Sequence, residues 1–266
     1  MNMKKVITIY MSFMLSVVLF LSGCSSKIDS TASAGDIIGI IGAMDVEVAS
    51  IKEEMTINEK KTFAGMEYTI GTFGNANIVV VKCDMGKVNA GICASTLINQ
   101  LGCTKIINTG VAGALDKKLK MGDIVISTDA VQHDFDARPI GYERGEIPYT
   151  GLVSFKADEK LIDEIYEVAS EFDEHTNVYK GRVCTGDQFI ASVEELEKIV
   201  SSFGGLCCEM EGGAIAQVCY LNKTPFVIIR TISDTPGVTE ISEYQEKEAD
   251  FSLKCARIVE KMLRNW

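Results

Sequence analysis

Short apolar runs alternate with amphipathic segments along most of this chain. Strands are expected where β-branched and aliphatic residues cluster between glycine or polar residues, at 36–41, 68–73, 78–83, 105–109, 123–127, 178–184, 206–208 and 225–230. Helices are expected where apolar residues recur every three or four positions, at 45–55, 88–101, 158–172, 193–203, 213–220 and 242–263. This alternation predicts one α/β domain, with a mixed central β-sheet flanked by helices on both faces.

Candidate functional residues follow directly after several of these strands. Gly42 ends the first strand, Met44 and Glu47 come next, and Asp45 is placed to cap the first helix. The run 105–109 leads into a glycine-rich stretch that ends at Gly113, where the backbone can approach a ligand closely. Because ligands of open α/β sheets bind beyond the carboxyl ends of the strands, we expect the site there.

The first 35 residues do not follow this pattern. Lys4 and Lys5 precede an uncharged apolar run, 6–21, and small residues lead from it to Cys24, as in an export signal. The Leu-Ser-Gly-Cys segment ending at Cys24 resembles a bacterial lipobox, which implies cleavage before Cys24 and a lipid on its sulfur.

The chain is therefore divided into a lipoprotein signal peptide (1–23), a small polar tether (24–35) and a folded domain (36–266). We expect a protein that is exported and anchored at the extracytoplasmic face of the cell membrane. A retained membrane anchor or a chance leader is the alternative.

The charge balance restricts the class of partner. The chain has 266 residues, enough for a substantial core, and a formal net charge of −11. The only charges ahead of Cys24 are those of Lys4 and Lys5, so the remainder carries −13. Such a surface repels phosphate backbones, so nucleic acid is not expected as a partner, and membrane attachment would come from the lipid.

Nine cysteines and two histidines bear on metal and disulfide chemistry. No Cys-x-x-Cys pair is present, so we expect no metal site. Most of the cysteines lie inside apolar patterns and are expected to be buried free thiols, although disulfides remain open in an exported protein. His133 and His175 are expected at surface or loop positions.

Three acidic motifs carry the strongest functional signal: residues 42–48, 209–213 and 230–234. Cleaving a ribosyl bond to a purine needs an acid for the leaving base, a base for water and a group that holds the sugar hydroxyls. Carboxylates can fill all three roles. Each motif also has a purely structural explanation: Glu47 in a first helical turn, Glu211 paired with Arg230, and Asp234 capping a turn.

From residue 36 onward the chain resembles the purine nucleoside phosphorylase and uridine phosphorylase superfamily, and within it the 5′-methylthioadenosine/S-adenosylhomocysteine nucleosidases. The resemblance lies in five ordered segments, which are 39–44 with Glu47, 107–113, 186–190, 209–211 and 232–234. It implies a nucleoside phosphorylase-like fold and hydrolysis of the N-glycosidic bond without a cofactor, releasing adenine and the 5-substituted ribose. 5′-Deoxyadenosine is included as a candidate substrate.

The resemblance also implies roles for individual positions. Glu47 corresponds to the base that activates water, and Asp234, with Ser233 beside it, to the acid that protonates adenine at N7. Glu211 corresponds to the acceptor of the ribose hydroxyl hydrogen bonds. The remaining implied substrate contacts are Met44, Met85, Gly113, Phe189, Ile190 and Met210. One departure is Val111, which stands where some members of the family have serine.

In the family, a loop similar to 135–149 packs across a homodimer, so a homodimer is expected, with an exposed mobile lid as the alternative. Alternative functions are nucleoside phosphorolysis, futalosine-type hydrolysis, and nucleoside delivery to a transporter by a lipid-anchored binding protein. Phosphorolysis needs a cationic phosphate cradle, whereas residues 44–47 are acidic and the chain has only six arginines. A binding protein has no use for an acid and a base in one pocket.

Overall fold

The structure is a computed structural model and describes residues 35–266. Cys24, the signal peptide and nearly all of the tether lie outside these residues, so the division at 1–23 and 24–35 stays a prediction. Residues Asp36–Trp266 form one compact unit. Among the helices of 35–266, none combines the length and the apolar character that a bilayer span requires.

A mixed β-sheet forms the centre of the domain. Its strands are β1 (Ile37–Gly42), β2 (Thr56–Phe63), β3 (Met66–Phe73), β4 (Ala76–Lys82), β5 (Lys105–Ala114), β6 (Ile124–Gln132), β7 (Ser154–Lys156), β8 (Val178–Thr185), β9 (Cys207–Glu209) and β10 (Phe226–Asp234). They follow the order β10-β6-β8-β9-β5-β1-β4-β3-β2, and β7 pairs with β6. An additional parallel pairing joins β10 to β5, so β10, β6, β8, β9 and β5 close on themselves.

This closure brings several strand ends together. β1, β5 and β10 run parallel, with Ile38 opposite Lys105 and Phe226 opposite Ile106 at their beginnings. Their carboxyl ends therefore lie at the same edge, and the short strand β9 pairs with the end of β5 there. The pairing of Gly113 with both Asp234 and Cys208 fixes the relative positions of three of the predicted motifs.

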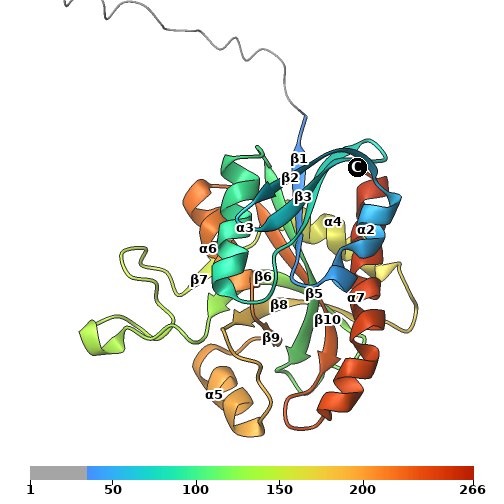
Figure 1. Cartoon of the computed structure of the whole chain (residues 1–266). Helices are drawn as coiled ribbons and strands as arrows, with labels where there is room; N and C mark the ends of the chain where they lie inside the picture. Colours follow the sequence, from blue (N-terminus) through green and yellow to red (C-terminus); the bar gives the residue numbers. More distant parts are fainter. Residues whose placement is uncertain (1–34) are drawn as a thin grey trace, which may run out of the picture. The chain divides into compact units, whose positions relative to one another are not determined.

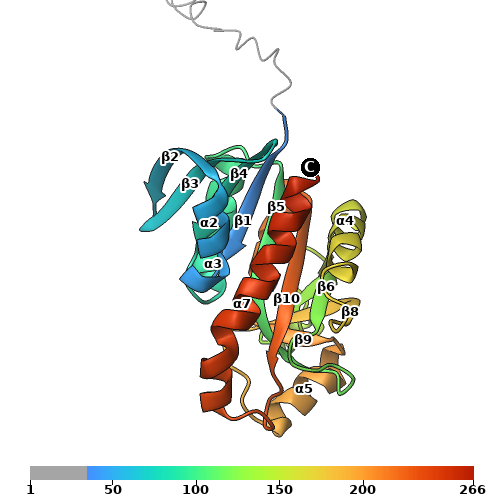
Figure 2. The same cartoon turned by 90° about the vertical axis from the view of Figure 1, so that its right-hand side faces the viewer.

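Helices cover the sheet on both sides (Figures 1 and 2). They are α2 (Ala49–Glu54), α3 (Lys87–Asn99), α4 (Glu159–Ser170), α5 (Val193–Phe203), α6 (Gly212–Asn222) and α7 (Ile241–Arg264), with 3-10 turns η1 (Asp45–Glu47) and η2 (Arg138–Ile140). α3 and α6 pack together on one side, while α7 packs against β10 and β5 on the other. The predicted fold class, a single α/β domain with a mixed sheet between helices, is confirmed.

The core consists of the apolar faces that the strand and helix patterns predict. Strands β1 and β10 are buried over nearly their whole length, which explains their continuous apolar runs. Asp158 and Ser192 cap α4 and α5 by accepting hydrogen bonds from Leu161 N and Glu195 N. Because burial of apolar area is the main source of folding free energy, these faces fix the scaffold that carries the site.

Three predictions about elements were wrong. Strand β2 was missed because its residues are almost all exposed, so its sequence has no alternating apolar face. The predicted helix 45–55 is divided into η1 and α2, and Asp45 caps neither, because its carboxylate pairs with Lys82 at 3.1 Å. The glycine-rich stretch up to Gly113 is part of β5 rather than a loop, since backbone pairing with β10 continues to its end.

Candidate active site

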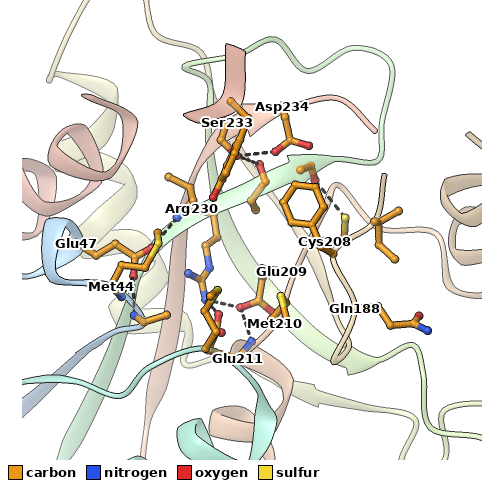
Figure 3. A pocket seen from close by; sticks show the side chains of 18 residues that line it. Met44, Glu47, Gln188, Cys208, Glu209, Met210, Glu211, Arg230, Ser233 and Asp234 are labelled. Atoms are coloured by element: carbon orange, nitrogen blue, oxygen red, sulfur yellow. Dashed lines mark hydrogen bonds and ion pairs between the residues drawn. The ribbon is translucent and has the colours of Figure 1, made fainter. Parts of the chain in front are cut away.

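One pocket opens at the edge where β1, β5, β9 and β10 end (Figure 3). It brings together every site residue that the sequence predicted inside the domain, and it adds several others. The lining residues are Ala43, Met44, Glu47, Met85, Val111, Ala112, Gly113, Gln188, Phe189, Ile190, Cys208, Glu209, Met210, Glu211, Arg230, Ser233, Asp234 and Tyr244. Glu47 and Asp234 are 187 positions apart in the sequence, and the fold brings both of them to this pocket.

Glu47 lies at the end of η1, immediately beyond β1, and is almost fully buried. Its Oε2 accepts hydrogen bonds from the N–H groups of Ala43 (2.5 Å) and Met44 (3.0 Å), and its Oε1 from Val111 N (3.2 Å). Burial raises the pKa of Glu47, while nearby Arg230 and the three N–H donors oppose that rise. Because Val111 acts through its main chain, a serine hydroxyl is not needed for this contact.

Asp234 ends β10 and is buried against the end of β5. The Ser233 hydroxyl donates hydrogen bonds to Asp234 Oδ1 (2.7 Å) and, more weakly, to the carbonyl of Ala112 (3.3 Å). Burial raises the pKa of Asp234, and the Ser233 hydroxyl partly opposes this by stabilising the ionised form. The result is a carboxyl group that holds its proton to higher pH than an exposed aspartate does.

Glu211 follows β9 and accepts a hydrogen bond from Gly86 N at 2.9 Å, which ties it to the start of α3. The guanidinium of Arg230 lies 3.7 Å from its other carboxylate oxygen. Burial raises the pKa of Glu211, the Glu209 carboxylate raises it further, and Arg230 lowers it. A buried carboxylate with so few donors has capacity for further hydrogen bonds from a ligand.

The main partner of Arg230 is Glu209, not Glu211 as the sequence suggested. Arg230 Nη2 donates to Glu209 Oε2 and to Asn108 Oδ1, the latter at 2.5 Å. From the sequence, Arg230 was a candidate for orienting a carboxylate of the site, whereas Glu209 belonged to a motif but had no role of its own. An arginine inside the otherwise apolar run of β10 was the available signal, because a buried guanidinium requires acidic partners.

Two aromatic side chains meet at one side of the pocket. The rings of Phe189, before α5, and Tyr244, in the first turn of α7, pack edge to face with centroids 5.5 Å apart. The Tyr244 hydroxyl donates to Glu248, one turn further along α7. Ile190 is buried beside Phe189, whereas Phe189 and Met85 are half exposed or more. The predicted contact residues therefore include exposed groups at the rim as well as buried groups inside.

Two further expectations concern histidine and cysteine. His133 lies in the turn directly after β6, so the expected loop position is confirmed, but it is buried against Gly186, so the expected surface position was wrong. His175 is exposed, as expected. All eight cysteines of the described residues are buried free thiols, in agreement with the prediction, and Cys208 forms part of the pocket wall.

Fold and pocket together define an α/β protein with a carboxylate-rich pocket at the carboxyl ends of its strands, and comparison with known proteins gives the family. The model described as the phosphorylase superfamily matches residues 37–264. This chain belongs to the phosphorylase superfamily.

Several proteins of known function are similar to this chain in sequence or in structure. The chain is 41% identical over 207 residues to a 5′-methylthioadenosine/S-adenosylhomocysteine nucleosidase of Staphylococcus aureus, covering 77% of this chain and 90% of that protein. The nucleosidase of Neisseria meningitidis, solved with methylthio-immucillin-A, has a TM-score of 0.82 at 31% identity, with 87% of this chain and all of that chain covered. The futalosine hydrolase of Helicobacter pylori has a TM-score of 0.81 at 30% identity, with 87% and 98% covered.

Proposed function

We infer that this chain is an N-glycosyl hydrolase that cleaves 5′-methylthioadenosine and S-adenosylhomocysteine, and accepts 5′-deoxyadenosine, releasing adenine and the 5-substituted ribose. The inference rests on one observation: the pocket contains two buried carboxyl groups with different hydrogen-bond partners. Asp234 is buried with a single hydroxyl donor, while Glu47 is held by three N–H groups and faces Arg230. The similarity to the Staphylococcus aureus nucleosidase supports the same substrates.

Asp234 is the general acid in this reaction. Departure of adenine places negative charge on the base, and a proton delivered to N7 neutralises it. Burial raises the pKa of the Asp234 carboxyl group, which is the direction that a proton donor at this position requires. Ser233 fixes one carboxyl oxygen, so the other oxygen is free to carry the proton towards the base.

Glu47 is the general base that takes a proton from the attacking water. The three N–H donors and the guanidinium of Arg230 favour its ionised form in spite of burial. A carboxylate whose pKa lies above its ordinary value is also a better proton acceptor than an exposed one. Figure 3 shows Glu47 and Asp234 on different sides of the pocket, which leaves room between them for the ribose.

The remaining residues hold the substrate in this orientation. Glu211 accepts hydrogen bonds from the ribose hydroxyls, and Met210 and Met44 pack against the sugar. Phe189 stacks on adenine, the backbone of Ile190 binds its edge, and the backbone of Gly113 lies close to the base. Met85, at the rim, contacts the 5′ substituent together with Tyr244.

Phosphorolysis is the less favoured reaction. Within the described residues, Arg230 is the one cationic side chain of the pocket wall. Its guanidinium already donates hydrogen bonds to Glu209 and Asn108. A phosphate cradle needs cationic or N–H donors that are free. Futalosine is the second candidate substrate, because the chain is similar to a futalosine hydrolase over nearly its whole folded part.

The purified protein is to be incubated with a panel of 5′-substituted adenosines and futalosine, with and without phosphate, while free adenine or hypoxanthine is measured. Adenine release from methylthioadenosine at a rate independent of phosphate is expected. Binding without turnover would instead support a nucleoside-binding protein of a transporter, and turnover of futalosine alone would support the second candidate.

The variants Asp234→Asn and Glu47→Gln test the two roles. Each is expected to lower kcat by ~10²- to 10⁴-fold, because each removes one proton-transfer group. Asp163→Asn, on the exposed side of α4 and paired with Lys180, is the matched control and should retain full activity. Near-normal turnover in either site variant would contradict the mechanism.

Homodimer formation is also proposed, on the basis of an apolar surface beside the pocket. Exposed apolar side chains gather on α3, on α6 and in the segment between β6 and β7: Val88, Ile92, Ile140, Tyr149, Tyr220 and Leu221. Figure 1 shows this segment projecting from the body on the same side as α6. A second copy packed on this surface would bury these residues and cover the rim at Met85.

Export with a lipid on Cys24 remains a proposal supported by the sequence alone. Lys4, Lys5, the apolar run 6–21 and the lipobox-like segment before Cys24 are its support. Expressed in a bacterial host, the full chain should accumulate in the membrane fraction and be cleaved by protease added to spheroplasts. Cys24→Ala should remove lipid labelling. A full-length protein found unprocessed in the cytoplasm would contradict the proposal.

A further inference from the structure

Three carboxylates surround one guanidinium at the base of the pocket. Arg230 is only 1% exposed and contacts Glu209 directly, while Glu211 lies 3.7 Å away. Glu47 approaches from the third side: a methyl group added at Gly110 would overlap both Arg230 Nη1 and Glu47 Oε1. The proposed function gives Glu47 and Glu211 a role in the reaction. It gives no role to Glu209, although Glu209 is also buried.

The hydrogen bonds of Glu209 distinguish it from the other two carboxylates. Its Oε2 accepts from Gly212 N (2.7 Å), Glu211 N (3.2 Å) and Arg230, and its Oε1 accepts from the Thr185 hydroxyl. Both oxygens are therefore occupied by the protein itself. Glu211, by contrast, has one short donor, Gly86 N, and keeps acceptor capacity for a ligand.

We infer that Glu209 is a positioning residue for the hydrolysis, which anchors Arg230 so that the guanidinium does not close onto Glu211 and leaves its oxygens free for the ribose hydroxyls. This inference rests on the proposed function. Glu209 acts on the ribose-binding carboxylate by two routes, through the side chain of Arg230 and through the main-chain N–H of Glu211. Asn108, on the neighbouring strand β5, also accepts a hydrogen bond from Nη2 of Arg230 and is the second anchor of the guanidinium.

The charges agree with this arrangement. Three carboxylates and one guanidinium in a dry pocket leave an excess of negative charge, which disfavours ionisation of each carboxylate. After burial, the Glu209 carboxylate is the largest cause that raises the pKa of Glu211. Replacing Glu209 by glutamine removes this repulsion and frees Arg230 to pair with Glu211, so both effects lower the pKa of Glu211.

Other titratable groups near the three carboxylates do not reverse the expected decrease in the pKa of Glu211. A hydrogen bond with Cys93, followed by burial, raises the pKa of Cys83, and burial raises the pKa of the other neighbouring thiols, so they stay neutral; burial lowers the pKa of His133. The groups that face the cluster from β4, β6, β8, β9 and α7 are Cys83, His133, Cys184, Cys207, Cys208, Tyr244 and Cys255. Asp234 is shifted by burial and Ser233 only, so it is independent of Glu209.

The pH dependence of kcat/KM separates positioning from a merely structural role. Glu47 must be ionised to take a proton from water and Glu211 must be ionised to accept the ribose hydroxyls, so kcat/KM falls at low pH as either carboxylate is protonated, and Glu209→Gln acts on the part of this acid limb that belongs to Glu211. In Glu209→Gln this acid limb should move to lower pH by about one unit, while the alkaline limb set by Asp234 stays in place. KM should rise about tenfold, as for loss of a hydrogen bond to a charged group.

The experiment compares the wild type, Glu209→Gln, Glu209→Asp and Asp129→Asn. Glu209→Asp keeps the negative charge on a shorter side chain that reaches Arg230 less well. Its acid limb should therefore stay in place while its KM rises. Asp129→Asn breaks a comparable Asp–Arg pair, with Arg182 on β8 and outside the pocket, and should leave KM and both limbs unchanged.

An acid limb that does not move in a folded Glu209→Gln protein overturns the inference. If that variant does not fold, Glu209→Asp decides: an unchanged KM there overturns the inference, and a raised KM with an unmoved acid limb supports it. A wild type that releases no adenine from any nucleoside would instead overturn the proposed function.

Discussion

At the scale of single residues, the proton on Asp234 is controlled by two opposing effects. Burial favours the neutral form, and the hydrogen bond from Ser233 favours the ionised form. An acid in hydrolysis acts only while it is protonated, so activity is lost as pH rises through its pKa. The strength of one hydroxyl contact therefore helps to set the upper pH limit of the enzyme.

Ser233→Ala tests this control. Without the hydroxyl the pKa of Asp234 rises further, so the alkaline limb of kcat/KM should move to higher pH, by up to about one unit. The maximal rate should fall, because the carboxyl group also loses the contact that orients it. Rate measurements between pH 5 and 10, with Ser192→Ala at the cap of α5 as the control, check the direction. A limb that moves to lower pH would contradict the assignment of Asp234 as the acid.

Three carboxylates of the candidate site could be predicted from the sequence because each belongs to a short motif at the end of a strand. Glu47, Glu211 and Asp234 are of this kind, and the structure places all three at one pocket. The contact between Glu209 and Arg230 was not predicted, because it depends on how β9 and β10 meet across the closed sheet. Register between distant strands is a tertiary property that local pattern does not encode.

At the scale of elements, the glycine-rich end of β5 decides whether the site can form. Gly110 leaves the space in which Arg230 and Glu47 approach each other, and Gly113 lies against Asp234 and Cys208. A strand with ordinary side chains at these positions would push the three carboxyl-bearing elements apart. Glycine here serves close approach within a continuous strand, a use that the sequence pattern presented as a loop.

Gly110→Ala is predicted to lower kcat by at least ~10²-fold, since its methyl group would separate Glu47 from Arg230 and displace the base. Gly65→Ala is the control: it lies in the turn between β2 and β3, with a positive φ of 81° and open space around it. It should lower the free energy of unfolding by about 1 kcal/mol while activity remains normal. Thermal melts and steady-state rates measure both, and an active Gly110→Ala protein would contradict the geometry.

Most elements could be predicted because their apolar faces are buried in a regular pattern. α5 was predicted to the residue, and α4 and α7 to within two residues at each end. Two of the three failures, β2 and the end of β5, share one cause, which is the absence of a buried face or of large side chains. β2 is exposed along its length, and the end of β5 consists largely of glycine and alanine.

At the scale of the whole molecule, assembly is the main open property, and the apolar surface on α3 and α6 makes it testable. Val88→Lys and Leu221→Lys place charges on that surface, at side chains that are 73% and 62% exposed in the single chain. Each should convert a dimer into monomers in sedimentation experiments and raise KM, because the rim of the pocket loses its cover. Ile57→Lys, on the distant strand β2, is the control that should stay dimeric.

A wild-type protein that sediments as a fully active monomer would contradict the dimer. So would charged variants that remain dimeric with an unchanged KM, because the second copy would then have to bind on another face.

The direction of β1 has a practical consequence. This strand leads from Asp36, at one end of the sheet, to Met44 and Glu47 at the other, so the chain enters the domain on the end opposite the pocket. A support, affinity handle or electrode surface coupled ahead of Asp36 would leave the mouth of the pocket unobstructed. Immobilised by its amino terminus, the protein could serve as a reusable sensor element for methylthioadenosine in a flowing sample.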